Sequence, residues 1–94
     1  MRFEILCSFL TVVQQGSISA AARKLHIAQP ALCKQMQQLE EELSDTLLIR
    51  ESRKIILTES GKTLCKRTEL LKQLKNSLRS EMTELSHSLN YAHR

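Results

Sequence analysis

The side chains best suited to binding another molecule gather around the single proline of the chain. Gln29, Pro30, Cys33 and Lys34 lie at spacings that bring them to one side of a helix. A glutamine amide can pair with adenine through two hydrogen bonds, a lysine can reach guanine or a phosphate, and small apolar groups can contact the methyl group of thymine. These residue types would suit the recognition of duplex DNA if the surrounding elements hold this side of the helix outside the core; without such a context, Gln29 would simply be an exposed residue at a helix start.

Carboxylates are absent from a long stretch around these residues. No Asp or Glu occurs from Ile5 to Leu39, although Arg23, Lys24 and Lys34 lie inside that stretch. The whole chain has 94 residues and a formal net charge of +4. Because a basic surface without carboxylates attracts phosphates, we expect an anionic partner.

Other kinds of chemistry find little support. The sequence contains no paired carboxylates, no nucleophile beside a base and no phosphate-binding glycine loop, so we expect neither an enzyme nor a cofactor in this chain. Cys7, Cys33 and Cys65 form no CxxC pair, which argues against a zinc site or a disulfide framework. No apolar run has the length of a membrane span, and we therefore expect a cytoplasmic protein.

Cys33 raises one alternative, a redox sensor whose thiol would block binding when oxidised. A thiol becomes susceptible only when it has thiolate character, which a sequence does not reveal. A small residue without a redox role is the simpler interpretation of Cys33.

Three helices are predicted before residue 44. Apolar residues recur at helical spacing over 3–15, where Gly16 ends the first helix, and Ser17 can cap a second one. The second helix would turn an inner face of Ile18, Ala21, Ala22 and Leu25 to the core. A break follows at 26–28, and Pro30 is tolerated in the first turn of a new helix that begins at Gln29. Its predicted buried stripe is Leu32, Met36, Leu39 and Leu43.

A short β-hairpin is predicted over residues 47–57. This segment loses helical periodicity and becomes rich in β-branched residues around a polar centre, which would place Arg50, Arg53 and Lys54 near the tip. The turn lacks the glycine that a tight connection usually needs. Thr58 can cap a final helix, with Glu59 favourably placed at its positive end.

The final helix is predicted to run to Asn90 or beyond with an apolar stripe along it. The stripe consists of Leu64, Leu71, Leu74, Leu78, Met82, Leu85 and Leu89. A stripe this long must be covered, and a second copy of the same helix would cover it as a dimer interface. The alternative is a helical protein-interaction module in which the stripe is the functional surface and the basic charge is incidental.

Together these elements predict a mainly α fold, a winged helix-turn-helix followed by a long dimerisation helix. At this point the sequence resembles the LysR-type transcriptional regulators of bacteria. The resemblance covers most of the first 61 residues without a gap, and its landmarks are Phe9, Gly16-Ser17, Ala21-Ala22, Leu25, Gln29-Pro30-Ala31-Leu32, Gln35, Leu39-Glu40, Leu43, Leu47, Arg50, Arg53, Leu57-Thr58 and Gly61.

The resemblance implies an organisation and a mode of binding. Residues 1–58 would form the DNA-binding domain, with the helix-turn-helix at about 18–37 and the wing at about 47–57, and residues 59–94 the linker helix. It further implies a C-terminal effector-binding domain outside this chain, where a small-molecule effector would bind. The partners implied are double-stranded DNA with a partly palindromic site and a second copy of the chain, with a tetramer as an option for the full-length protein.

The predicted DNA-contacting residues fall into two groups. Base contacts are expected from Gln29, Pro30, Cys33 and Lys34, although Pro30 could serve only to start the helix and Lys34 could reach a phosphate instead. Contacts with the backbone or the minor groove are expected from Ala31, Gln35, Gln37, Gln38, Arg50, Arg53, Lys54 and Thr58. Among these, Arg53 resembles the family's wing residue that enters the minor groove.

Several positions depart from the family pattern. Ala28 stands where a capping serine is usual, a loss of about 1 kcal/mol. Lys34 stands where arginine is common. Its ammonium group is a compact charge and does not form the paired hydrogen bonds that a planar guanidinium group can make. Ser44 stands where glycine often ends the helix. We expect none of these changes to alter the fold.

Overall fold

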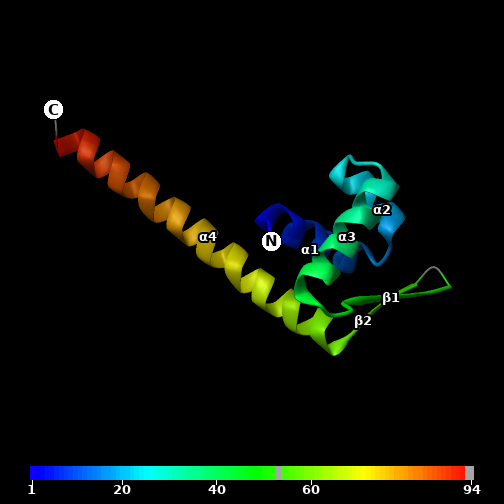
Figure 1. Cartoon of the computed structure of the whole chain (residues 1–94). Coiled ribbons are helices and arrows are strands. Elements are labelled where there is room, and N and C mark those ends of the chain that lie inside the picture. The colour runs from blue at the N-terminus through cyan, green and yellow to red at the C-terminus, as the bar shows by residue number, and fades with distance from the viewer. Residues whose placement is uncertain (53, 93–94) are drawn as a thin grey trace.

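The computed structural model describes residues 1–52 and 54–92, with side chains as far as His87. Within these residues the element order is α1 (Phe3–Gln15), α2 (Ile18–Leu25), α3 (Gln29–Leu43), β1 (Leu48–Glu51), β2 (Lys54–Leu57) and α4 (Glu59–Ala92) (Figure 1). The first three helices pack together, the hairpin projects from them on one side, and α4 leaves on the other. The predicted fold class, a mainly α winged helix-turn-helix with a long last helix, is confirmed.

The ends of α1 and α2 are made by the residues that the sequence indicated. Gly16 adopts a left-handed conformation with φ of 72°, and its backbone N–H donates to the carbonyl oxygen of Val12. The hydroxyl oxygen of Ser17 accepts a hydrogen bond from the Ala20 backbone N–H at 3.0 Å. These two caps join α1 to α2 without an intervening loop.

The turn between α2 and α3 is also closed by backbone bonds. His26 ends α2 in the left-handed region, with φ of 57°, and the Ile27 N–H donates to the Ala22 carbonyl oxygen at 3.1 Å. Ala28 precedes α3 without a side-chain cap, as its methyl group requires, and Pro30 lies in the first turn. The predicted helix start at Gln29 is confirmed.

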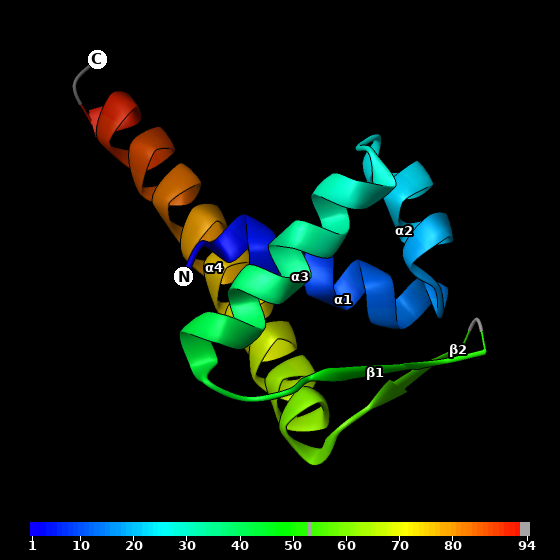
Figure 2. The same cartoon turned by 45° about the vertical axis from the view of Figure 1, so that its right-hand side comes forward.

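The core forms where α1, α2 and α3 meet. Its largest fully buried apolar side chains are Phe9, Val12, Leu32, Leu39 and Leu47. Ala21 and Ala22 are buried as well, and their small size lets the neighbouring helix approach closely. Figure 2 shows α3 crossing α1 at a steep angle, which leaves the opposite side of α3 outside the core.

One member of the predicted buried stripe of α3 is not buried. Leu32, Met36 and Leu39 are buried, but Leu43 is 36% exposed. The prediction for Leu43 was wrong because this residue lies in the last turn of α3, at the open edge of the core. There it lines a surface groove together with Leu47, Leu64 and Arg67.

The hairpin forms without the glycine that its tight turn would usually contain. The strands are antiparallel, with Leu48 opposite Leu57 and Glu51 opposite Lys54, so only residues 52 and 53 connect them. Ser52 takes a positive φ of 41°, which supplies the backbone geometry that such a connection needs. Arg53 itself lies outside the described residues.

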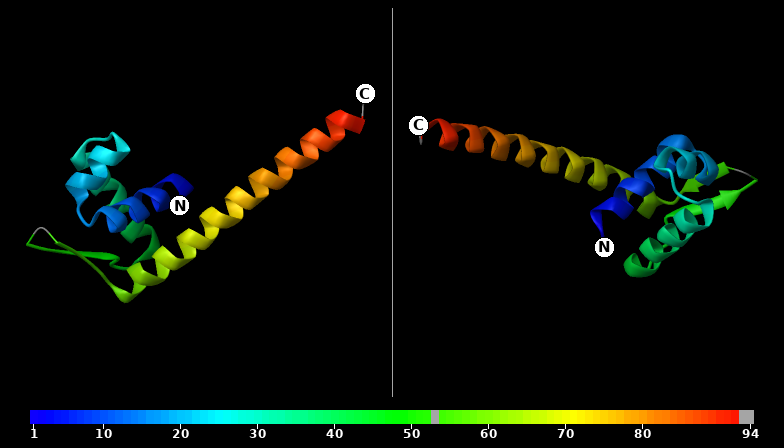
Figure 3. Two further views of the ribbon diagram at one scale, coloured as in Figure 1. Left: turned by 180° about the vertical axis from the view of Figure 1, so that it is seen from behind. Right: turned by 90° about the horizontal axis from the view of Figure 1, so that it is seen from above.

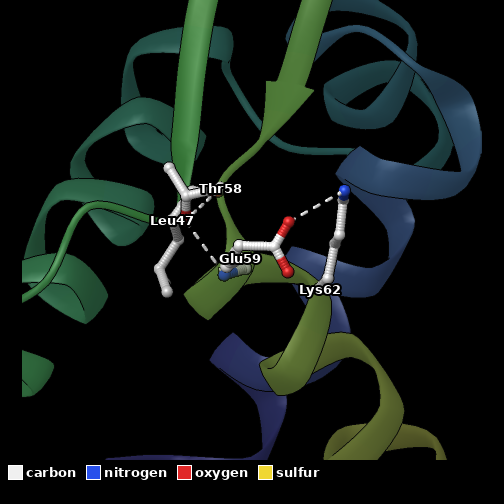
Figure 4. A network of polar contacts seen from close by, with 5 residues as sticks. Leu47, Thr58, Glu59 and Lys62 are labelled. Atoms are coloured by element: carbon white, nitrogen blue, oxygen red, sulfur yellow. Dashed lines mark hydrogen bonds and ion pairs between the residues drawn. The ribbon is translucent and has the colours of Figure 1, made fainter.

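The hairpin is tied to the start of α4 by a polar junction (Figure 4). The Thr58 hydroxyl donates to the Thr46 carbonyl oxygen at 2.6 Å and accepts from the Gly61 N–H at 3.0 Å, which confirms Thr58 as the helix cap. The Thr58 N–H donates to the Leu47 carbonyl oxygen at 3.1 Å. Gly61 lies so close that an added Cβ would stand 2.3 Å from that same oxygen, so only glycine fits.

Only the first part of α4 packs on the body of the molecule. Thr68 is 1% exposed, and the Lys75 ammonium lies 4.0 Å from the centre of the Phe3 ring. Beyond this point the helix extends alone and gives the molecule extents of 62 × 26 × 20 Å (Figure 3). None of the described helices has the length and apolar character needed to cross a membrane.

Candidate nucleic-acid interface

From Gln29 to Gln38 the exposed side of α3 carries no carboxylate, and Glu41 follows on the same side, where it lines a surface hollow together with Gln37. The carboxylate-free part consists of Gln29, Pro30, Ala31, Lys34, Gln37 and Gln38, which we call the reading face. Below it, Leu32, Met36 and Leu39 anchor the helix in the core. The structure therefore brings together half of the twelve predicted base-contacting and backbone-contacting residues on one accessible surface.

Gln29 is held by a residue of the preceding helix. The Ser19 hydroxyl donates to the Gln29 side-chain oxygen at 2.9 Å, and both residues are exposed. Ser19 was not among the residues predicted from the sequence. The two residues are ten positions apart, and only the turn between α2 and α3 brings them together.

Cys33 lies at the side of the reading face rather than at its centre. It is half-buried and packs against the core, and the Arg50 guanidinium nitrogen Nη2 lies 2.7 Å from its sulfur. The guanidinium of a wing residue is thereby placed beside α3. Arg50, predicted as a backbone contact, thus stands next to a predicted base contact.

Two further predicted contacts have their polar groups engaged or turned inward. The Gln35 side-chain oxygen is buried, with no hydrogen-bond partner among the described residues. The Thr58 hydroxyl is occupied in the cap of α4. Both residues therefore stand apart from the reading face, whereas Lys54 is exposed on the hairpin.

The acidic residues of α3 are Glu40, Glu41 and Glu42 at its far end, and Glu40 and Glu42 are engaged by donor groups. Glu40 is half-buried, and its Oε2 atom accepts hydrogen bonds from the backbone N–H groups of Leu47 at 2.7 Å and Leu48 at 3.2 Å. Glu42 pairs with the N-terminal ammonium at 3.2 Å. Glu40 thus fixes the start of the hairpin relative to α3, a positioning role that the sequence analysis missed.

A second surface runs along α4. Leu71 is 41% exposed, Leu74 is 67% exposed, and Leu78, Met82 and Leu85 are each 55% exposed. We call these five residues the linker stripe. Leu64, predicted to belong to it, is half-buried and packs against the core of its own chain. The side chain of Leu89 lies outside the described residues.

Groups suited to other chemistry do not gather in the part of the chain that the structure describes. No three His, Cys, Asp or Glu side chains among residues 1–52 and 54–92 are arranged to hold a metal ion. Burial and the nearby Glu69 carboxylate raise the pKa of the Cys65 thiol, so this sulfur stays protonated at neutral pH and is a poor nucleophile.

Comparison with known sequences identifies relatives over most of the chain. A sequence model described as "Bacterial regulatory helix-turn-helix protein, lysR family" matches residues 3–62. The nitrogen assimilation regulatory protein nac of Escherichia coli is 48% identical over 64 residues, which is 68% of this chain and 21% of the relative. The transcriptional regulator GltR of Bacillus subtilis is 38% identical over 86 residues, 92% of this chain and 29% of the relative. The chain thus spans less than a third of the length of these relatives.

Comparison with solved structures gives the same result for the fold. A DNA complex of the CbnR DNA-binding domain has a TM-score of 0.87 at 32% identity, over 92% of this chain and 99% of that one. The complex of the BenM DNA-binding domain with catB site 1 DNA has the same TM-score at 36% identity, over 92% and 97%. Full-length BenM matches with a TM-score of 0.83 at 37% identity, over 88% of this chain and 27% of that chain.

Proposed function

Since the chain belongs to the lysR family of bacterial regulatory helix-turn-helix proteins, we propose that it is the sequence-specific DNA-binding part of a transcriptional regulator. The observation that carries this proposal is the reading face, the exposed side of α3 from Gln29 to Gln38, which carries no carboxylate and belongs to a helix anchored by a buried stripe. Proteins similar to this chain over more than nine-tenths of its length have been solved in complex with DNA.

The proposed mode of binding places α3 in the major groove. Gln29 would pair with adenine through its amide, and Lys34 would contact guanine or a phosphate. Pro30 and Cys33 would supply small contacts to bases. The Ala31 N–H lies in the first turn, where backbone donors lack a partner within the helix, and would bind a phosphate.

The hairpin would hold the neighbouring stretch of DNA. Lys54 is exposed and Arg50 lies beside Cys33, so their charges flank the reading face. Arg53 is the residue proposed for the minor groove, where a narrow groove attracts arginine. Gln37 and Gln38 lie further along α3 and would contact the sugar-phosphate backbone.

We propose that the linker stripe mediates dimerisation. Exposed leucines spaced along a single extended helix are covered most simply by the same helix of a second copy. Two reading faces related by two-fold symmetry would bind half-sites about one or two helical turns apart, which makes the operator partly palindromic. A tetramer of the full-length protein is compatible with this arrangement.

The remaining parts of the proposal concern the longer protein. The curated relatives are several times longer than this chain, and a small-molecule effector would bind in a C-terminal domain beyond residues 1–94. The chain itself would act by binding DNA rather than by catalysis, and in the cytoplasm, where its operator lies.

The proposal is tested by selecting preferred duplexes from a random pool with the 94-residue chain and then with Gln29→Ala. We expect a partly palindromic consensus for the unchanged chain and the loss of preference at one position per half-site for the variant. An unchanged consensus would contradict the base-reading role of Gln29.

A salt titration separates this function from the protein-interaction module that the exposed linker stripe would also suit. Binding that relies on phosphate contacts weakens steeply as the salt concentration rises, because counterions are released from the DNA. An interaction module would bind no duplex even at low salt.

A further inference from the structure

The hydrogen bond between Ser19 and Gln29 joins two elements at the point where the reading face begins. Ser19 lies in the first turn of α2, whereas Gln29 is the first residue of α3. The Ser19 hydroxyl donates to the Gln29 side-chain oxygen at 2.9 Å. No other side-chain hydrogen bond reaches Gln29 within the described residues.

The bond is compatible with the pairing of Gln29 with a base. A carboxamide oxygen has two lone pairs, and its NH₂ group has two donors. A bidentate contact with adenine uses one lone pair, to accept from N6, and one N–H, to donate to N7. The Ser19 hydroxyl can therefore keep the second lone pair while the amide pairs with the base.

The bond also reduces the conformational entropy that an exposed glutamine side chain would otherwise lose when it binds DNA. Gln29 has several rotatable bonds, and immobilising such a side chain at an interface opposes association. A side chain already held in one orientation loses less freedom when DNA arrives. Because Ser19 belongs to a different helix, the orientation is fixed relative to the body of the domain and not merely within α3.

We infer that Ser19 is a positioning residue for Gln29, and that it contributes to sequence discrimination without itself reading a base. This inference rests on the proposed function. It predicts that removing the hydroxyl weakens binding to the preferred duplex by about two- to tenfold, the range set by the ordering of one flexible side chain. It predicts no comparable loss on duplexes in which the base paired by Gln29 has been changed.

The experiment compares four chains on two duplexes, the consensus selected from a random pool and the same duplex with that base pair changed in each half-site. The chains are the unchanged protein, Ser19→Ala, Gln29→Ala and the double variant. We expect Ser19→Ala to reduce the affinity ratio between the two duplexes. In the Gln29→Ala background, Ser19→Ala should have no further effect, because the group that it positions is gone.

Two controls separate positioning from other roles. Ser19→Thr retains the hydroxyl and should restore discrimination, whereas Ser80→Ala, at an exposed serine of α4, should change neither affinity nor discrimination. Ser19 is exposed, so Ser19→Ala should unfold at the same temperature as the unchanged chain.

Other outcomes would overturn the inference in distinguishable ways. An equal loss on both duplexes that persists without Gln29 would show that Ser19 contacts the DNA backbone directly. Unchanged discrimination by Ser19→Ala, with discrimination lost in Gln29→Ala, would reject the positioning role and leave the proposed function intact. The absence of any selected consensus with the unchanged chain would instead reject the proposed function.

Discussion

Apolar side chains are buried at one end of the molecule and exposed at the other. From α1 to β2, which we call the head, they meet inside one chain, so that Phe9, Leu32 and Leu39 are fully buried. Along the outer part of α4, the leucines of the linker stripe stay more than two-fifths exposed. The head can therefore be stable as a monomer, whereas the stripe becomes buried only if another surface covers it.

The same contrast separates the two proposed binding events. The head presents polar side chains on an anchored helix and would bind DNA, while α4 presents apolar side chains and would bind a second copy. Substitutions on the reading face should therefore leave dimerisation unchanged, and substitutions in the linker stripe should leave the folding of the head unchanged. The following predictions test this separation.

The largest effect is expected from a cavity in the head. Leu32→Ala removes a fully buried side chain and should lower the free energy of unfolding by about 2–5 kcal/mol. Leu74→Ala, at a side chain that is 67% exposed, should leave the unfolding of the monomer nearly unchanged. Urea titration at protein concentrations too low for dimerisation measures the free energy of unfolding of both variants. Equal losses of stability in the two would contradict the proposed difference between the head and the outer part of α4.

A smaller loss is expected where the head joins α4. Gly61→Ala would place a methyl group 2.3 Å from the Leu47 carbonyl oxygen, so the hairpin and the helix must move apart, at a cost of about 1–3 kcal/mol. Lys62→Ala, at an exposed neighbour, is the matched control. Thermal unfolding of the two variants checks the prediction, and an unchanged midpoint for Gly61→Ala would mean that the junction is looser than the structure shows.

The linker stripe should control association rather than folding. Leu78→Ala removes apolar surface that would be buried in a dimer, and should weaken dimerisation by about 1–2 kcal/mol for each side chain covered. Sedimentation across a range of concentrations measures the dissociation constant. Arg79→Ala, at the next residue of the helix, which is also exposed, serves as a control, and an equal effect would place the contact elsewhere on α4.

The smallest effect is a gain in stability. Ser44 ends α3 in the left-handed region, with φ of 52°, where a residue with a side chain is strained. Ser44→Gly should relieve about 1 kcal/mol and raise the unfolding midpoint without changing the dimer dissociation constant. A loss of stability would show that the Ser44 side chain makes a favourable contact that outweighs the backbone strain.

The helices and strands were predictable because their boundaries are set by residues that lie at or next to those boundaries in the sequence. Gly16, Ser17, Pro30 and Thr58 each act within a few positions of themselves, as caps or helix starters. Leu43 was predicted wrongly because helical periodicity gives the direction of a side chain but not the point at which the core ends.

The finer structure of the candidate site was less accessible from the sequence. Ser19 with Gln29, Arg50 with Cys33, and Glu40 with the Leu47 and Leu48 amides are pairs separated by 7 to 17 residues. Each depends on how two elements pack, which no local pattern encodes. Residue types and their spacing in the sequence thus predicted the reading face. The groups that orient it could be identified only from the three-dimensional structure.

The most direct test of the two-region account is a titration of the isotopically labelled chain with its selected duplex, followed through the backbone amide signals. We expect the largest shifts in Gln29–Gln38 of α3 and in the hairpin, with the outer part of α4 unaffected at concentrations where its association state is constant. Shifts concentrated between Leu74 and Leu85, with the reading face unchanged, would contradict the assignment of DNA recognition to α3.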